Sequence, residues 1–495
     1  MSRRTLCSAM NSPRRWNPMP FVAAFIGAGV IAILLRNQPA PQAQVGAIFA
    51  FTVILWITEA LPLGITALVG SSLLIVVAGL PEKTIFAAYG DPIVPLFIGS
   101  FILAKAMETT GLSERLAWVI LRRPWTTKTP SRMLFTLAAV TCVISLFVSN
   151  TATTAMMLPI GLSILHSLNR DARGTPFAVA LLLTLTWASS VAVGTPVGTP
   201  PNLIAISMIA DVTGTRIGFV EWMLFGMPVT VLMLVGSWGL LRVLYRRDEP
   251  DTAGKAQHAL DRLASMGPMA GSERVALSAF VLALVLWILP DTYSAVAGQA
   301  DPVATWLRDH ITAAVAALIA ASVLFVLPVR DREGGRAITW REAATIDWGT
   351  ILLFGGGIAL GHGMFASGLA KSLGEAVARV AGAESVWAIT ALGIACAIAL
   401  SEIANNTTSA STLVPVFIGL SQGAGVNPIP AALGVAIGAS LGFMLPVSTA
   451  PNAIVYSSGM IPGKQMMKAG LYVDVLGFAV VWVCLRLILP PMGLA

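Results

Sequence analysis

Two polar tripeptides interrupt apolar stretches of the chain that are long enough to enter a membrane. They are Ser149-Asn150-Thr151 and Asn405-Asn406-Thr407. Hydroxyl and amide side chains at membrane depth are costly without partners, so they indicate a functional site. The alternative is that they only cap helix ends. Because the motif occurs twice, we favour a binding role in addition to capping.

The composition of the chain is that of a helical membrane protein. Of its 495 residues, 56% are hydrophobic and 11% are charged, and the mean hydropathy is +0.80. Soluble domains carry about 25% charged residues. The net charge of +7 does not indicate nucleic-acid binding, because the basic residues cluster in short loops, as the positive-inside rule expects. The four cysteines form no C-x-x-C pair and are interpreted as small hydrophobic residues.

The N-terminus carries four arginines before its first apolar run. This pattern fits a signal peptide or a first transmembrane helix with a basic cytoplasmic tail. We favour the helix, because a cytoplasmic N-terminus places the later charged loops correctly. The expected topology has the C-terminus outside, in a bacterial inner (plasma) membrane.

Apolar runs predict an all-α polytopic protein with eleven transmembrane helices. These helices are expected at residues 20–35, 45–61, 62–80, 93–121, 177–210, 223–244, 275–289, 312–327, 349–366, 431–456 and 471–489.

Two further apolar segments are predicted to be re-entrant hairpins. Residues 133–165 are flanked on both sides by basic loops, so a single crossing would place one basic loop outside. The segment must therefore enter and return, with Ser149-Asn150-Thr151 at its tip. By the same argument residues 386–420 enter from the opposite side.

Two of the predicted helices are broken. Three prolines and two glycines between Gly194 and Asn202 interrupt residues 177–210, and a similar segment at 446–452 interrupts residues 431–456. Such sequences cannot continue a helix, so each is expected to form two half-helices.

The hairpins and broken helices recur in the same order in both halves of the chain. Asn150-Thr151 recurs 256 residues later, and Pro196, Thr199 and Asn202 recur 250 residues later. We divide the chain into an N-terminal tail and helix (1–44), a first repeat (45–245), a cytoplasmic linker (246–274) and a second repeat (275–495). The repeats have opposite predicted orientations, which is typical of secondary transporters with a site at the repeat interface.

The four breaks contain almost no charge, so they offer hydroxyls, amides and backbone groups. Helix N-termini suit a carboxylate or sulfate, and unwound carbonyls suit Na⁺. A site without a fixed Lys or Arg binds a divalent anion poorly by itself. Bound Na⁺ would supply the missing positive charge. A protein that exchanges one anion for another could use the same arrangement of hairpins and broken helices.

Together the paired tripeptides and Pro/Asn turns resemble the divalent anion/Na⁺ symporter family, over nearly the whole chain. The resemblance implies a homodimer in the lipid bilayer. Each protomer would have a scaffold domain and a transport domain that moves like an elevator, carrying a small dicarboxylate and Na⁺.

The resemblance also implies roles for particular residues. Substrate would be held by Asn150, Thr151, Thr199, Pro200, Asn406, Thr407 and Thr449. The first Na⁺ site would use Ser145, Ser149, Asn150 and Gly198, and the second would use Ser401, Ala404, Asn406 and Ser448. Thr407 resembles the dicarboxylate-selective members. Asn405, where the family usually has Ser, and Ala450, opposite Pro200 of the first repeat, depart from the pattern.

We therefore expect a Na⁺-coupled symporter of C4-dicarboxylates such as succinate, malate and fumarate. A Na⁺-independent dicarboxylate exchanger and a symporter of sulfate or a tricarboxylate remain alternatives. An enzyme is disfavoured, because no nucleophile–base pair or His/Asp/Glu cluster is present. Three ionisable residues in apolar segments have no assigned role. Lys105 and His362 could contact substrate, but snorkelling or hydrogen bonding in the domain interior is favoured. For Glu402 a helix-tip hydrogen bond or support of the second Na⁺ site is favoured over a proton relay.

Overall fold

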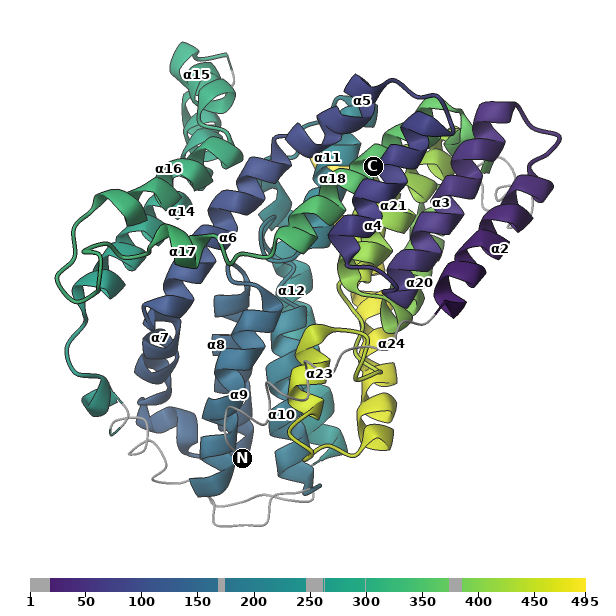
Figure 1. Cartoon of the computed structure of the whole chain (residues 1–495). Helices are drawn as coiled ribbons and strands as arrows, with labels where there is room; N and C mark the ends of the chain where they lie inside the picture. Colours follow the sequence, from purple (N-terminus) through teal and green to yellow (C-terminus); the bar gives the residue numbers. More distant parts are fainter. Residues whose placement is uncertain (1–17, 168–173, 246–260, 262, 299, 374–384) are drawn as a thin grey trace.

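The structure is a computed structural model that describes residues 18–167, 174–245, 261, 263–298, 300–373 and 385–495. Within these ranges the regular structure is helical, apart from one isolated β-bridge between Pro328 and Arg336. This agrees with the predicted all-α fold (Figure 1).

The first half of the chain, up to the linker, contains eleven of the described α-helices. They are α2 (Met19–Leu34), α3 (Ala40–Thr58), α4 (Leu63–Val76), α5 (Glu82–Ala87), α6 (Ile93–Thr109), α7 (Leu112–Leu121), α8 (Pro130–Ser145), α9 (Asn150–Ser167), α10 (Pro176–Ser190), α11 (Pro200–Thr213) and α12 (Phe219–Leu244). Proline occupies the first turn of α8, α10 and α11, where its missing N–H leaves no helical bond unmade.

After the linker, the second half repeats the pattern. Its helices are α14 (Gly271–Ala297), α15 (Pro302–His310), α16 (Ala313–Val326), α17 (Trp340–Ala343), α18 (Trp348–Ala366), α20 (Val386–Ile403), α21 (Asn406–Gly423), α22 (Ile429–Ala439), α23 (Ala450–Tyr456) and α24 (Gly463–Ile488).

Two parts of the predicted helix pattern were wrong. The single helix expected at 93–121 is divided into α6 and α7 at Gly111, whose φ of +81° lies in the left-handed region that glycine tolerates. Helix α15 was not predicted. The Asp301 side chain caps its N-terminus, and α15 and α16 meet at an angle of 68°. Most of the predicted linker, residues 246–260 and 262, lies outside the described residues.

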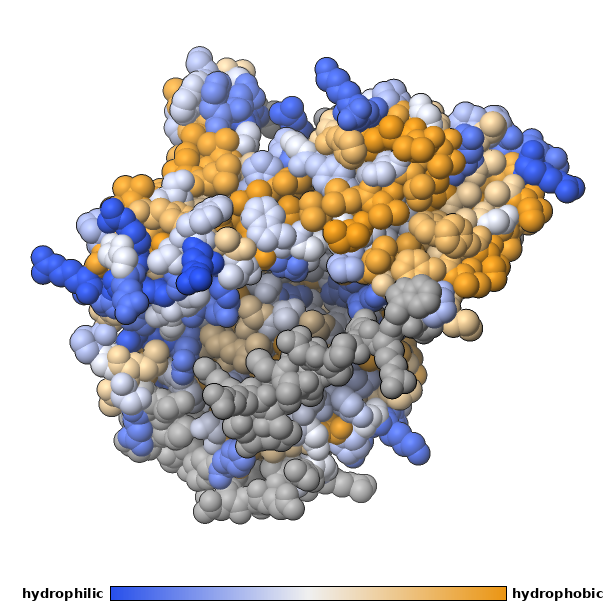
Figure 2. Space-filling view, viewed as in Figure 1, coloured by the Kyte–Doolittle hydropathy of each residue, from blue (hydrophilic) through white to orange (hydrophobic). Residues whose placement is uncertain are grey.

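Seven helices of the described chain are long and apolar enough to cross a membrane, and the bent pair α15–α16 would make an eighth. Several other apolar helices are shorter, namely α2, α4, α8, α10 and α22. The chain is therefore an integral membrane protein, and eleven crossings remain a prediction. Apolar surface gathers over α2, α3 and α4 in Figure 2, where Phe25, Ile33 and Val76 are at least 65% exposed, as lipid contact requires.

Both predicted hairpins are divided into two helices at the polar tripeptides. In the first half, α8 ends at Ser145 and α9 begins at Asn150; in the second, α20 ends at Ile403 and α21 begins at Asn406. Figure 1 shows α8 and α9 in the lower half of the molecule and α20 and α21 in the upper half. The two tripeptides therefore approach the middle of the molecule from opposite sides.

The broken helices pack in a way that joins the two halves. Each hairpin packs on the first part of its own broken helix: α8 and α9 on α10, and α20 and α21 on α22. The second part crosses over, so that α11 packs on α21 and α23 packs on α9. This reciprocal exchange brings the four breaks to one place.

An ion pair and several hydrogen bonds connect the start of α14 to neighbouring segments. Arg115 on α7 contacts Glu273 on α14 at 2.8 Å, and its guanidinium also donates to the carbonyl of Gly267 at 2.9 Å. Asp331 accepts hydrogen bonds from the hydroxyl and backbone N–H of Ser272, which lower the pKa of its carboxyl. These contacts fix the start of α14 relative to α7 and the loop after α16.

Candidate binding site

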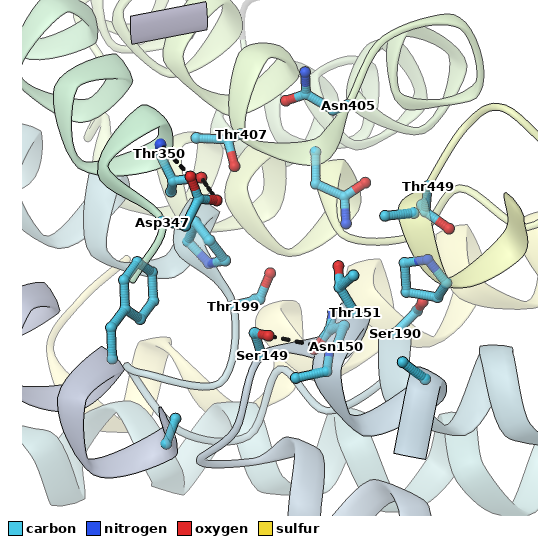
Figure 3. A pocket seen from close by; sticks show the side chains of 18 of the residues that line it. Ser149, Asn150, Thr151, Ser190, Thr199, Asp347, Thr350, Asn405, Thr407 and Thr449 are labelled. Carbon is cyan, nitrogen blue, oxygen red and sulfur yellow. Dashed lines mark hydrogen bonds between the residues drawn. The ribbon is translucent and has the colours of Figure 1, made fainter. Parts of the chain in front are cut away.

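A cavity of about 640 Å³ opens between the four breaks and the helices α6 and α18. In Figure 3, Ser149, Asn150, Thr151 and Thr199 lie on one side, and Asn405, Thr407 and Thr449 lie on the other. The cavity wall opposite the breaks comes from α6, from the segment before α18 and from the link between α3 and α4.

All seven residues predicted to bind substrate line this cavity: Asn150, Thr151, Thr199, Pro200, Asn406, Thr407 and Thr449. Three residues predicted for Na⁺ binding, Ser149, Gly198 and Ser448, line it too. Ser145 and Ser401 do not line it; each lies behind a tip asparagine and donates to it. Ala404 is buried in the extended link between α20 and α21.

The first residue of each tripeptide caps the helix that follows it. The Ser149 hydroxyl accepts from the N–H of Ala152 at 3.2 Å, and the Asn405 Oδ1 accepts from the N–H of Thr408 at 2.9 Å. Both are bonds to the residue three positions later, so Asn405 performs the capping function of a serine. Position 405, where the second tripeptide differs from the first, therefore makes the same capping bond as Ser149.

Oxygen atoms converge at the first tip. The Ser145 hydroxyl donates to Asn150 Oδ1 at 2.9 Å and also contacts the Ser189 carbonyl at 3.0 Å. If the Asn150 amide is turned by half a rotation, its nitrogen donates to the carbonyls of Ser189 at 3.1 Å and Gly198 at 3.3 Å. Because carbonyl oxygens only accept hydrogen bonds, this orientation is the favourable one, and in it the nitrogen also donates to the Ser145 hydroxyl at 2.9 Å.

The second tip repeats this arrangement. The Ser401 hydroxyl donates to Asn406 Oδ1 at 2.9 Å and contacts the Ala439 carbonyl at 2.7 Å. These three residues follow Ser145, Asn150 and Ser189 by 256, 256 and 250 positions. The structure therefore reproduces the repeat in individual hydrogen bonds, including the carbonyls, which side-chain patterns could not reveal.

A second pair of asparagines holds the unwound segments in shape. The Asn202 amide nitrogen donates to the carbonyl of Thr195 at 2.9 Å, and the Asn452 nitrogen donates to the carbonyl of Leu445 at 3.1 Å. Both asparagines are fully buried. The repetition of Asn202 and Asn452 was visible in the sequence, but their role in bonding the unwound carbonyls was not predicted. An amide placed directly after Pro-Pro or Ala-Pro in an apolar segment is a signal that could have suggested it.

Hydrogen bonds also cross between the repeats. The Thr186 hydroxyl on α10 donates to Asn452 Oδ1 at 2.7 Å, and the hydroxyls of Thr199 and Ser440 are 3.2 Å apart. All four side chains are buried. These bonds connect the two broken helices directly.

Glu402 tethers the break of the second repeat. Its two carboxylate oxygens accept from the N–H groups of Met444 and Leu445, each at 2.9 Å, and Asp474 on α24 accepts from the N–H of Phe443 at 3.3 Å. This confirms the favoured interpretation of Glu402 as a hydrogen-bonding residue. In the first repeat Leu146 takes its place, and its carbonyl accepts from the Thr195 hydroxyl.

The other two unassigned ionisable residues have different surroundings. Lys105 lines the cavity, and its Nζ is 3.2 Å from Glu108 Oε2. His362 lies elsewhere, with Nε2 at 3.1 Å from Asp211 Oδ2 on α11. No group of three or more His, Cys, Asp or Glu side chains suited to a metal ion occurs in the described part of the chain.

Comparison with known proteins identifies the family. The model of the sodium:sulfate symporter transmembrane region matches residues 22–492. This chain belongs to the sodium:sulfate symporter family. The motifs had predicted this family as the divalent anion/Na⁺ symporters. A member of it is a membrane transporter and not an enzyme.

Two curated relatives are sodium-dependent dicarboxylate transporters named SdcS. The one from Staphylococcus saprophyticus is 32% identical over 478 residues, covering 93% of this chain and 90% of the relative. The one from Staphylococcus aureus is 33% identical over 449 residues, covering 88% and 84%.

The fold is also similar to that of solved transporter structures. The YdaH transporter of Alcanivorax borkumensis has a TM-score of 0.59 at 17% identity, covering 92% of this chain and 99% of that one. MtrF of Neisseria gonorrhoeae has a TM-score of 0.57 at 14% identity, covering 92% and 96%. At these identities the likeness concerns the fold alone.

The hydrogen bond from Thr186 to Asn452 can be removed to test whether it stabilises the packing of the two broken helices. Thr186→Val removes the donor and leaves the buried Asn452 Oδ1 unpaired, which costs about 1–3 kcal/mol. Thr184→Val is the matched control, because the Thr184 hydroxyl bonds only the Ala180 carbonyl of its own helix. Thermal unfolding in detergent should show a clearly lower midpoint for Thr186→Val than for Thr184→Val. Equal midpoints would mean that the cross-repeat bond contributes nothing.

Proposed function

We propose that this protein is a secondary active transporter that couples inward movement of Na⁺ to uptake of C4-dicarboxylates such as succinate, malate and fumarate. The observation that carries the proposal is that two opposed helix N-termini, each beginning with Asn-Thr, open onto one cavity. The relatives named for sodium-dependent dicarboxylate transport support the same choice.

The N-termini of α9 and α21 supply the anion-binding groups. The first-turn N–H groups of a helix lack helical partners, and the helix dipole adds partial positive charge there. Asn150 and Thr151 extend this donor set at one tip, and Asn406 and Thr407 extend it at the other. Two such tips suit a molecule with a carboxylate at each end. Thr199, Pro200 and Thr449 would close the sides of the pocket.

The oxygens behind the tips would hold the coupling ions. At the first tip, Ser145, Ser149, the Asn150 amide oxygen and the Gly198 carbonyl provide hard ligands for Na⁺. At the second, Ser401, Ala404, Asn406 and Ser448 would do the same. Since each asparagine belongs to both an ion site and the substrate pocket, a bound cation would fix its amide and add positive charge beside the anion.

Transport would follow an elevator mechanism in a homodimer. The transport domain would contain the hairpins and the broken helices, and α6 and α18 would belong to the scaffold. Glu59, Glu108 and Asp347 line the cavity at helix ends that the expected topology assigns to the cytoplasm. The conformation described here would therefore be inward-facing, with the N-terminus inside and the C-terminus outside.

Uptake into proteoliposomes tests the coupling directly. An inward Na⁺ gradient should drive accumulation of labelled succinate in empty vesicles, and replacement of Na⁺ by choline should abolish it. The reason is that the tips lack a fixed cation to bind the dianion. Uptake that ignores Na⁺ but requires vesicles preloaded with dicarboxylate would instead establish exchange.

The role of Thr407 is tested by its isosteric replacement. Thr407→Val removes a hydroxyl that lines the cavity and should raise the KM for succinate roughly tenfold, the loss expected for one hydrogen bond to a charged group. Thr408→Val is the control: Thr408 is fully buried, does not line the cavity, and its hydroxyl has no partner in the described residues. An unchanged KM for Thr407→Val would remove Thr407 from the pocket.

A further inference from the structure

We propose that Lys105 on α6 is a specificity-determining residue that favours doubly charged over singly charged substrates, and that Glu108 tunes its strength. The inference rests on the proposed function, because it concerns the charge of the anion that the cavity accepts. It assigns a role to a scaffold residue outside the helix breaks.

Lys105 lies in the middle of the α6 face that forms one wall of the cavity. Ser100, Phe101, Ala104, Lys105 and Glu108 all line it, and their spacing of three to four residues defines a single helical stripe. The Lys105 side chain is 26% exposed, so its ammonium group is accessible from the cavity but partly shielded from bulk water. A charge in this setting is screened less than one on an open surface.

The charged side chains of the cavity wall make this lysine important for an anion. The described lining residues include three acids, Glu59, Glu108 and Asp347, and one base, Lys105. These acids repel a dianion twice as strongly as a monoanion at the same distance, because the Coulomb energy scales with charge. Lys105 is the group on this wall that offsets the repulsion, and its attraction doubles in the same way.

The neighbouring acid limits how much positive charge Lys105 presents. Its Nζ is 3.2 Å from Glu108 Oε2, one turn later on the same helix. The Glu108 side chain is 50% exposed, so this pair is not buried as a structural ion pair would be. Exposed pairs of this kind contribute little to folding stability, which favours an electrostatic role at the cavity.

The inverted repeat supplies no second base for this cavity. His362 occupies the position on α18 that corresponds to Lys105, 257 residues later. It is outside the cavity lining, and its ring contacts Asp211. In the conformation described here, the wall that faces the tips therefore depends on Lys105 for positive charge.

The test measures how tightly a dianion and a monoanion bind to variants that differ in charge at positions 105 and 108. The dissociation constants of succinate and its monomethyl ester are measured by calorimetry on detergent-purified protein in saturating Na⁺. Lys105→Gln should weaken succinate binding roughly five- to tenfold and the monoanion by much less. Lys105→Arg should restore succinate binding, since it restores the charge. Glu108→Gln should tighten succinate binding roughly two- to threefold, because it frees the lysine.

Lys83→Gln is the matched control, because it removes the same charge from an exposed position on α5 that does not line the cavity. Its succinate affinity should equal that of the unmodified protein. Thermal unfolding midpoints of all variants show whether each remains folded.

Three results would each overturn the inference while leaving the proposed function intact. One is normal succinate binding by Lys105→Gln. The second is an equal loss of affinity for succinate and its monomethyl ester, and the third is the same direction of change for Lys105→Gln and Glu108→Gln. A purely structural role would produce the second or the third. If the unmodified protein binds no dicarboxylate in Na⁺, both the inference and the proposed function fail.

Discussion

The structure depends on one constraint: polar groups released by helix breaks must find partners inside the protein, because lipid offers none. Four breaks meet at the cavity, and each exposes backbone N–H and carbonyl groups. Asn202 and Asn452 bond the carbonyls of the broken helices, and Ser145 and Ser401 bond the tip asparagines. Other residues of the breaks, among them Thr151 and Thr407, line the cavity, where an anion and its accompanying cations would supply partners.

The two repeats meet this constraint with different side chains. Thr186 donates to Asn452 Oδ1, but the corresponding position in the second repeat is Ala436, and Asn202 Oδ1 is buried with no partner among the described residues. Glu402 binds two N–H groups of one break, whereas Leu146 uses only its carbonyl in the other. The second repeat is thus held at its break by carboxylates, and the bond from Thr186 to Asn452 has no counterpart from the second repeat to Asn202. An inverted repeat preserves backbone geometry while the bonds that stabilise it diverge.

The existence of the breaks was predicted because their cause is local: proline and glycine cannot continue a helix, and Ser149 and Asn405 are good capping residues. The links between α8 and α9 and between α20 and α21 lie at the predicted tripeptides. The breaks of the two broken helices begin earlier than predicted, after Ser190 and after Ala439, and they end earlier because α11 and α23 include the prolines in their first turns. The division at Gly111 was missed because one glycine in an apolar run is ambiguous. Helix α15 was missed because it is short and polar.

The site itself was predicted only on the side that carries the repeated motifs. The cavity wall from α6 and the segment before α18 could not be derived, because it depends on how distant helices pack. Lys105, Asp347 and Glu59 have no shared motif, and the carbonyls of Ser189 and Ala439 carry no sequence signal at all. Repetition revealed the tripeptides; only the three-dimensional arrangement revealed what faces them.

The tripeptide tips carry no charged side chain, and we propose that they bind a dianion because cations bind beside them. The most direct test is the dissociation constant of succinate for the purified protein, measured as Na⁺ replaces choline at constant ionic strength. We expect the affinity for succinate to rise steeply with Na⁺, by roughly tenfold or more, a coupling of the size common between linked sites. A dissociation constant that is the same in choline as in Na⁺ would contradict it.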